Sequence, residues 1–402
     1  MTFEIQSITD LVVPALEPFG PVVLALNDHL AQNPEISNEE YRSSAVIVET
    51  LRRAGLEVEY PFGGEPTGFR AIIRGGLEAP QEAPLEARPK IALLAEYDAL
   101  PGVGHGCGHC ASGSISVWSA LALHSLRGQF AGEVHLIGTP DEEALGGKIR
   151  MAQRGVFQGY ALAIMLHMFN RNAVFTPFLA LDSIRFEFTG QAAHAAASPW
   201  EGRNALNAVQ LLFHASDMLR QHVKSDIRVQ GIITKGGEAP NIVPDFTSAD
   251  FYTRGKLRTD LDDVSEWLRD CGRAAALATR TQLKVYDFAP PLKNLTGNTP
   301  GEDLLRQLYT YHQLELADEA AIQLGSSDIG ELDDYCPTFH PLLNVRRDLV
   351  LHTRGFAEQM TAPAGHQAVV NGARIIASFI WAVLQDDALL AAIQTDYQTR
   401  RG

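Results

Sequence analysis

The 402-residue sequence is short of cysteine, of basic charge and of long apolar segments. Its four cysteines do not have the spacing of a disulfide framework, which favours a reducing compartment. Lys and Arg number 33 against 48 Asp and Glu, and the net charge of -15 disfavours nucleic acid or an anionic membrane as a partner. No apolar run approaches the roughly 18 residues of a spanning helix, so we expect no membrane crossing. The start, MTFEIQSITD, lacks a basic segment before an apolar one, so we expect no signal peptide and a cytoplasmic location.

Apolar residues are plentiful: 46% of the sequence is hydrophobic and 20% is charged, as in globular proteins. We find neither an internal repeat nor a low-complexity tract. The length exceeds that of a common single domain, so two compact domains are expected.

The first part of the chain alternates apolar runs with helical patterns. A helix is predicted within residues 33–55, begun by a capping box of Ser37 and Glu40. The Pro-, Glu- and Ala-rich segment 76–89 is predicted to be an exposed loop. Further strands are predicted at residues 69–75, 90–98, 133–140 and 161–168, and further helices at residues 114–128 and 148–155. Continuous apolar strands separated by helices predict an α/β domain with a mainly parallel sheet and helices on both faces.

The pattern changes near Leu181, where SIRFEFTG alternates apolar and polar residues as in a half-exposed strand. From there to residue 291 the order is strand, helix, strand, strand, helix, strand, which is the ferredoxin-like βαββαβ arrangement. We therefore predict an α/β domain of residues 1–181 and 292–402, interrupted by an inserted domain of residues 182–291. A helix at residues 365–385 is predicted to close the chain.

The loop LPGVGHGCGHC follows the predicted strand 90–98 and leads into a helix. Its side chains should therefore lie at the carboxyl end of the sheet, where open α/β sheets bind ligands. Cys107 and His109, set among glycines, form a candidate metal half-site. A glycine-rich turn around a buried thiol is the alternative.

Two other predicted strands end in ligand-type residues. Asp141, Glu142 and Glu143 follow the strand 133–140, and His167 ends the strand 161–168. Burying such groups unpaired is costly, and metal coordination offsets that cost. Three strand ends that deliver such residues to one edge favour a metal site.

These segments resemble the co-catalytic dinuclear metallopeptidases and amidohydrolases, the family of aminoacylase, carboxypeptidase G and p-aminobenzoyl-glutamate hydrolase. The resemblance covers nearly the whole chain, and AEYDALPG followed by GHGCGH is most similar to the acyl-dipeptide amidohydrolase and aminobenzoyl-glutamate branch. Other matching segments are NPEISNEE, GTPDEEALGGKIRMAQRGVF, MLHM, GQAAHAAASPWEGRNAL, EAPNIVPD and GSSDIGELDDYCPTFHP.

The resemblance implies two divalent metal ions per subunit, zinc or manganese. The implied metal ligands are Cys107, His109, Glu143, His167 and His352. Cys107 would be shared by both ions, and His340 is the only nearby rival of His352. Glu142 would be the general base: a metal ion lowers the pKa of bound water toward roughly 7, and Glu142 would move its proton to the departing amine.

Further residues are implied around these ligands. Asp98 would orient His109, unless it only caps a turn, and His105 stays unassigned. His194 would reach into the partner subunit's active site and help to hold the oxyanion, although without the resemblance it is an ordinary loop histidine. Asn241 and Arg254 would bind the substrate carboxylate, with a surface salt bridge as the alternative for Arg254.

The inserted domain is expected to serve dimerisation, because its exposed strand edge can pair with a copy of itself. A homodimer or a tetramer would result. The predicted function is metal-dependent hydrolysis of the amide bond in a small substrate with a free carboxylate, such as an N-acyl amino acid, a dipeptide or aminobenzoyl-glutamate.

Two alternatives compete with this function. A non-catalytic ligand-binding relative would be expected to lose Glu142 or several ligands, yet all are present. Position 110 is cysteine where the family usually has aspartate or asparagine, which creates a Cys107-x-x-Cys110 pair of the thioredoxin redox type. Redox chemistry would not need the acids at 141–143, His167 or His352.

Overall fold

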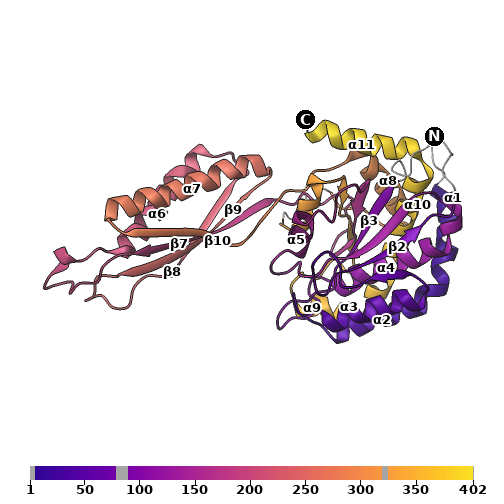
Figure 1. Ribbon diagram of the computed structural model, residues 1–402, viewed down its shortest axis with the longest axis horizontal. Helices are drawn as coiled ribbons and strands as arrows, with labels where there is room; N and C mark the ends of the chain where they lie inside the picture. Colours follow the sequence, from indigo (N-terminus) through magenta and orange to yellow (C-terminus); the bar gives the residue numbers. More distant parts are fainter. Residues whose placement is uncertain (1–4, 78–88, 319–324, 402) are drawn as a thin grey trace. The chain divides into compact units, whose positions relative to one another are not determined.

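The computed structural model describes residues 5–77, 89–318 and 325–401, which form two compact units (Figure 1). The larger unit draws on residues 1–177, 295–324 and 328–402, and the inserted unit on residues 178–294 and 325–327. The inserted unit thus extends a few residues beyond the predicted 182–291 at each end. The loop predicted at 76–89 falls almost entirely outside the described residues.

A six-stranded sheet forms the centre of the larger unit, in the order β1-β2-β4-β3-β5-β11. Strands β4, β3, β5 and β11 run parallel to one another, while β2 is antiparallel to β4 and to β1. This parallel-rich sheet confirms the predicted α/β class. The strands are β1 (Glu57–Glu59), β2 (Phe69–Arg74), β3 (Lys90–Ala95), β4 (Glu133–Gly138), β5 (Leu162–Ile164) and β11 (Thr338–Phe339).

Helix α4 is the central helix of the larger unit, because β3, α1, α2 and α10 all pack against it. The helices are α1 (Ile5–Leu16), α2 (Gly20–Gln32), α3 (Tyr41–Arg53), α4 (His109–Ser125), α5 (Gly147–Gln153), α8 (Thr299–Tyr311), α9 (Arg354–Gln359), α10 (Pro363–Gln385) and α11 (Asp387–Arg401). The prediction that the helix at 365–385 closes the chain was wrong, since α11 follows and packs on α8. Only Ile393 of α11 is buried, so this helix carries little periodic signal.

The capping box predicted for the first helix was also wrong. Helix α3 begins at Tyr41 with Glu40 as its cap residue, and Ser37 lies outside it. The Ser37 hydroxyl instead donates to Asp98 Oδ2 at 2.8 Å, and Glu40 Oε1 accepts the backbone N–H groups of Asn38 and Asp141 at 2.9 Å each. The side-chain oxygens of Ser37 and Glu40, which the sequence pattern assigned to the start of α3, bind Asp98 and the Asp141 backbone instead.

The apolar segment 161–168, predicted as one strand, is divided between two sheets. Strand β5 joins the main sheet, whereas β6 (His167–Phe169) pairs in parallel with β12 (Leu342–Asn344). His167 therefore begins a strand instead of ending one.

Two helical segments, residues 5–32 and α10, are long and apolar enough to span a membrane by length and composition alone. The expectation that no segment approaches that length was therefore wrong. In α10, 72% of the apolar window is buried inside the protein, as in the core helix of a folded domain, against 33% in residues 5–32.

The inserted unit confirms the ferredoxin-like prediction. Its antiparallel sheet has the order β10-β7-β9-β8, and Ile184, Phe186 and Phe188 of β7 are fully buried in its core. Its elements are β7 (Ala180–Thr189), α6 (Ala205–Leu219), β8 (Arg228–Lys235), β9 (Phe246–Gly255), α7 (Arg258–Thr279) and β10 (Gln282–Leu292). Strand β8 is an edge strand on which Ile232 and Ile233 are exposed.

Candidate metal centre

Cys107 and His109 lie where the loop after β3 turns into α4. Gly108, between them, has a φ of +78°, and a Cβ there would lie 2.7 Å from the Met168 side chain. In the first turns of α4, a Cβ on Gly113 would lie 2.4 Å from the carbonyl oxygen of Glu96. Glycine at these two positions lets the helix start close against the strand end and turns His109 into the interior.

The His109 ring is fully buried and is oriented by Asp98. Its Nδ1 lies 2.9 Å from Asp98 Oδ1, so Nδ1–H donates and Nε2 is left for another partner. No hydrogen-bond partner meets Nε2 among the described residues; Glu96 Oε2 lies 3.3 Å and Glu142 Oε2 4.0 Å away. Burial by itself lowers the pKa of His109, but the carboxylates of Glu96 and Asp98 raise it well above its usual value. This buried nitrogen is surrounded by acids and therefore suits a cation.

Asp98 joins three segments of the site. Besides His109 it accepts the Ser37 hydroxyl at 2.8 Å and the backbone N–H of Glu143 at 2.9 Å. Burial raises the pKa of Asp98, but His109 and these donors lower it well below its usual range. Asp98 is thus an ionised carboxylate that positions other groups, as predicted for His109; its contacts to Ser37 and Glu143 were not foreseen.

Glu142 and Glu143 lie on the turn after β4. Asp141, which precedes them, has a φ of +64° and accepts Arg150 Nη1 at 2.7 Å. Glu143 Oε1 is buried without a hydrogen-bond partner in the described part of the chain. Burial, opposed by His109 and assisted by the neighbouring Glu142 carboxylate, raises the pKa of Glu143 to about 7. The turn therefore presents two adjacent carboxylates to the site.

Two groups of candidate ligand atoms meet at Cys107. One contains Cys107, His109 and His167, the other Cys107, Glu143 and His352, and within each group the ligand atoms lie no more than 4.8 Å apart. Burial raises the pKa of Cys107, and the Glu143 and Glu142 carboxylates raise it further, so its thiolate needs a cation nearby. A sulfur common to both groups can bridge two ions.

The two remaining predicted ligands differ in exposure. His167 Nδ1–H donates to the Met168 carbonyl at 2.7 Å, which leaves Nε2 available, and burial lowers the pKa of His167 to about 4. His352 is exposed, with a φ of +61°, and its backbone N–H donates to Gly106 at 2.9 Å. Its rival His340 is buried against His167, with ring centroids 5.3 Å apart, and belongs to none of the ligand groups found in the described residues.

Sequence analysis missed a set of buried charged residues beside these ligands. Lys148 is fully buried, and its Nζ lies 2.5 Å from Glu96 Oε1 and 2.6 Å from Asp328 Oδ1. Burial lowers the pKa of Lys148, but Asp328 and Glu96 raise it well above its usual value. The acid two positions before Asp98 was a signal for Glu96. Lys148 and Asp328 lie in segments that carry the family resemblance, but no role was predicted for either.

The structure disfavours the redox alternative. Cys110 is buried, with its backbone N–H donating to His105 Nδ1 at 3.2 Å, and burial raises the pKa of its thiol. A redox-active Cys-x-x-Cys pair needs a thiol whose pKa is lowered, and the pKa values of Cys107 and Cys110 are both raised.

The other predicted residues lie in the inserted unit. His194 is exposed, and its Nδ1 accepts the backbone N–H groups of Ala196 and Ala197 at 3.3 and 3.1 Å, so Nε2 carries the proton. The Ala195 N–H donates to the Asn241 carbonyl at 3.0 Å, which brings the His194 and Asn241 loops together. Arg254 lies near the end of β9, with a buried Nε that has no hydrogen-bond partner among the residues described.

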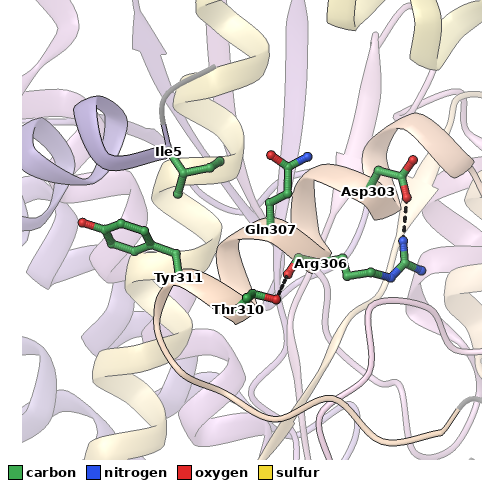
Figure 2. A pocket seen from close by; sticks show the side chains of 6 residues that line it. All are labelled: Ile5, Asp303, Arg306, Gln307, Thr310 and Tyr311. Carbon is green, nitrogen blue, oxygen red and sulfur yellow. Dashed lines mark hydrogen bonds and ion pairs between the residues drawn. The ribbon is translucent and has the colours of Figure 1, made fainter. Parts of the chain in front are cut away.

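A separate pocket of about 500 Å³ lies on the larger unit (Figure 2). Its polar side chains are engaged locally: Arg306 Nη1 donates to Asp303 at 2.6 Å, and the Thr310 hydroxyl donates to the Arg306 carbonyl at 2.8 Å. The lining residues are Ile5, Asp303, Arg306, Gln307, Thr310 and Tyr311, none of which was predicted as a site residue.

An α/β sheet with a ferredoxin-like insertion, and two ligand groups joined at one cysteine, define the class of co-catalytic metallohydrolases. The chain belongs to peptidase family M20/M25/M40, which matches residues 92–381. It is 32% identical over 391 residues to the Xaa-Arg dipeptidase of Mus musculus, covering 94% of this chain and 89% of the relative. It is also 31% identical over 305 residues to one of the subunits of p-aminobenzoyl-glutamate hydrolase from Escherichia coli (strain K12), covering 69% of this chain and 60% of that relative.

The fold is shared with a solved structure. A dinuclear metal binding peptidase of the M20 family from Bacillus subtilis matches with a TM-score of 0.68 and 17% identity, over 92% of this chain and 99% of that one. The predicted family, fold and enzyme class are confirmed: this chain is a metallohydrolase of peptidase family M20/M25/M40.

Proposed function

We propose that this chain hydrolyses the amide bond of a dipeptide or N-acyl amino acid with a free carboxylate, and that Glu142 is its general base and acid. The observation that carries the proposal is the difference between Glu142 and Glu143, which lie side by side on the turn after β4. Glu143 is grouped with Cys107 and His352, whereas Glu142 belongs to neither group that contains Cys107; its side chain is 15% exposed and lies 4.0 Å from His109 Nε2. Glu142 therefore borders the ligand cluster and can still meet a substrate.

The residues present fit two divalent ions, because buried His109 Nε2 and Glu143 Oε1 have no hydrogen-bond partner within the described chain. The ions would be held by Cys107, His109, Glu143, His167 and His352. Sulfur and imidazole donors suit zinc, and carboxylates suit manganese. When bound, the ions supply Lewis-acid polarisation of water and of the substrate carbonyl.

The chain's own groups then move the proton. Glu142 takes the proton of the attacking water and delivers it to the departing amine nitrogen. Asp98 holds His109 through Nδ1 and the Glu143 backbone through its N–H, so one carboxylate positions two ligands. The hydrogen bond from half-buried Ser37 to buried Asp98 keeps that arrangement in place.

The inserted unit supplies candidate substrate contacts. The outward Nε2–H of His194 is a suitable donor to an oxyanion, and Arg254 and the Asn241 amide suit a substrate carboxylate. The relatives' names, Xaa-Arg dipeptidase and p-aminobenzoyl-glutamate hydrolase, describe amides that end in an amino acid. We therefore propose dipeptides as the first substrate class to test. The four free cysteines support a reducing, cytoplasmic location.

The test is a metal assay joined to a substrate panel. Xaa-Arg and Xaa-Glu dipeptides, N-acetyl amino acids and p-aminobenzoyl-glutamate are assayed before and after chelation. We expect Glu142→Gln to lower kcat by at least about 100-fold with unchanged metal content. Glu39→Gln, a change to an exposed glutamate in the same chain, is the matched control and should leave the rate unchanged. Absence of metal, or an unchanged rate in Glu142→Gln, would contradict the proposal.

We also propose a homodimer in which His194 acts on the partner subunit's substrate. Exposed Ile232 and Ile233 on the edge strand β8 support strand pairing between copies. Mixing inactive Glu142→Gln subunits with inactive His194→Ala subunits should restore activity, since one active site per hybrid dimer would then be intact. Failure of hybrid dimers to regain activity would place His194 in its own subunit's site or outside the chemistry.

A further inference from the structure

The carboxylate of Glu96 is turned toward the ligand cluster and is not used by the predicted ligand set. Glu96 is 1% exposed, and its Oε2 lies 3.3 Å from Nε2 of His109, the ring nitrogen that Asp98 leaves without a proton when the imidazole is neutral. A neutral His109 would thus present a lone pair to a carboxylate oxygen, and the two would repel. Only a cation between them, either a proton or a metal ion, makes this contact favourable.

A histidine on β4 shows what an ordinary Glu–His contact looks like. His135 Nε2 lies 2.9 Å from Glu133 Oε2, and its Nδ1 lies 2.6 Å from the Tyr160 hydroxyl. Because the hydroxyl can donate to Nδ1 while Nε2–H donates to Glu133, the neutral ring satisfies both partners. His109 lacks this solution, since carboxylates lie on both of its nitrogens.

The spacing at His109 is that of two ligands on one ion. Zinc binds nitrogen and oxygen donors at about 2.0–2.2 Å, which in tetrahedral geometry sets neighbouring donors roughly 3.3–3.6 Å apart. The separation of 3.3 Å between Glu96 Oε2 and His109 Nε2 agrees with that value. Glu96 Oε1 is at the same time fixed by Lys148 Nζ at 2.5 Å, and Lys148 is fixed by Asp328 at 2.6 Å. Oε1 of Glu96 is therefore held in an ion pair with Lys148, and Oε2 faces His109 and the other candidate ligands.

We propose that Glu96 is a further direct ligand of the metal ion that His109 binds, with Lys148 and Asp328 as the residues that position it. This inference rests on the proposed dinuclear site. It adds an oxygen donor to an ion otherwise held by the sulfur of Cys107 and the imidazoles of His109 and His167. Carboxylate oxygen is a donor that manganese prefers, whereas sulfur and imidazole already suit zinc, so the added oxygen improves the site for manganese more than for zinc.

The experiment measures metal binding directly. Metal-free wild type, Glu96→Gln and Glu133→Gln are titrated with Mn²⁺ and with Zn²⁺ against a competing chelator dye, and bound metal is counted after gel filtration. We expect Glu96→Gln to weaken binding of one of the two ions by at least about 100-fold, more than the loss typical of residues that only orient a ligand. The loss should be larger for Mn²⁺ than for Zn²⁺. Glu133→Gln is the matched control, since it removes a Glu–His contact outside the cluster, and it should bind both ions like wild type.

A role of Glu96 as partner of a proton on His109, and not of a metal ion, predicts the opposite change in metal affinity. If Glu96 only pairs with a proton on His109 in the metal-free protein, Glu96→Gln removes a competitor of the metal and leaves affinity equal or higher, which would overturn the proposal. The thermal unfolding midpoint of each variant with metal is compared with that of the same variant without metal, so that a folding defect is not mistaken for lost affinity. A smaller metal-dependent rise of the midpoint in Glu96→Gln than in wild type supports the proposal. A rise equal to that of wild type contradicts it. Wild type that binds no metal and hydrolyses no amide would instead refute the proposed function itself.

Discussion

Two clusters of buried charge, one around Asp182 in the inserted unit and one around His109 in the larger unit, are compensated in opposite ways. In the inserted unit, Asp182 accepts Arg258 Nη1 and Nη2 at 2.8 and 2.6 Å and the Ser265 hydroxyl at 2.5 Å, so the carboxylate is fully matched by its neighbours. Arg185 and Asp250 form a similar two-bond pair. Such pairs hold elements together and leave nothing for a ligand.

Around His109 in the larger unit, acids outnumber bases. Glu96, Asp98, Glu142 and Glu143 converge on one ring, and Lys148 is the buried lysine among them. Since uncompensated buried charge is unfavourable, the cluster is stable only with added positive charge. The functional region is therefore marked by an excess of buried charge of one sign, and not by buried charge as such.

The largest effect is expected at the sulfur that joins the two ligand groups. Cys107→Ala removes a donor that belongs to both, so we expect kcat/KM to fall by at least about 1,000-fold, beyond the loss typical of an outer residue. Bound metal, counted by elemental analysis, should drop below that of wild type. Cys336→Ala, which alters a buried cysteine outside every ligand group found in the described residues, should retain both metal and activity. Full metal content in Cys107→Ala would show that Cys107 does not hold the metal ions.

A change to the matched charge of the inserted unit should affect stability and not metal. Asp182→Asn removes the charge that pairs with both Nη groups of Arg258 and leaves Asp262 at its Nε, and we expect a loss of roughly 3 kcal/mol in the free energy of unfolding. Urea denaturation followed by circular dichroism measures this loss, and metal content is counted in parallel. Metal loss without destabilisation would show that the two units do not divide these roles.

Acidic pH should weaken metal binding at the larger unit. The pKa of Glu143 is raised to about 7 by burial, and metal binds only the ionised carboxylate, so protons compete below that pH. From pH 8 to pH 6 we expect at least about a tenfold loss of metal affinity, because the ionised fraction of such a group falls about tenfold. Dye competition across this range tests it, with circular dichroism to verify that the chain stays folded. Affinity independent of pH would mean that Glu143 is not a ligand.

The smallest effect is expected at helix caps. Asn204 Oδ1 caps α6 by accepting the N–H groups of Leu206 and Asn207, and Asn204→Ala should cost about 1 kcal/mol. Asn298→Ala should cost more, since Asn298 caps α8 and its buried amide also donates to the Ile393 carbonyl of α11 at 2.9 Å. Urea denaturation of both variants compares the two caps. Equal losses would show that the link to α11 contributes nothing.

Much of the fold could be predicted from periodicity. Alternation in β7 and the βαββαβ order predicted the inserted unit, because these signals depend on neighbours along the chain. The errors occurred where distant partners intervened. Ser37 and Glu40 bind Asp98 and the Asp141 backbone instead of capping α3, and the segment 161–168 divides between two sheets.

By itself, the sequence determined the α/β class, the insertion and the ligand-type residues at the strand ends, since residue type and spacing express those directly. Three features depend on contacts across the fold: Cys107 is common to two ligand groups, Cys110 is a buried neutral thiol, and Glu96 lies beside His109 while Lys148 links it to Asp328. Buried charges are compensated by groups that are close in the folded structure, and such groups can be far apart in the sequence. Lys148 and Asp328 are 180 residues apart in the chain, and their contact exists only after folding has excluded water from both.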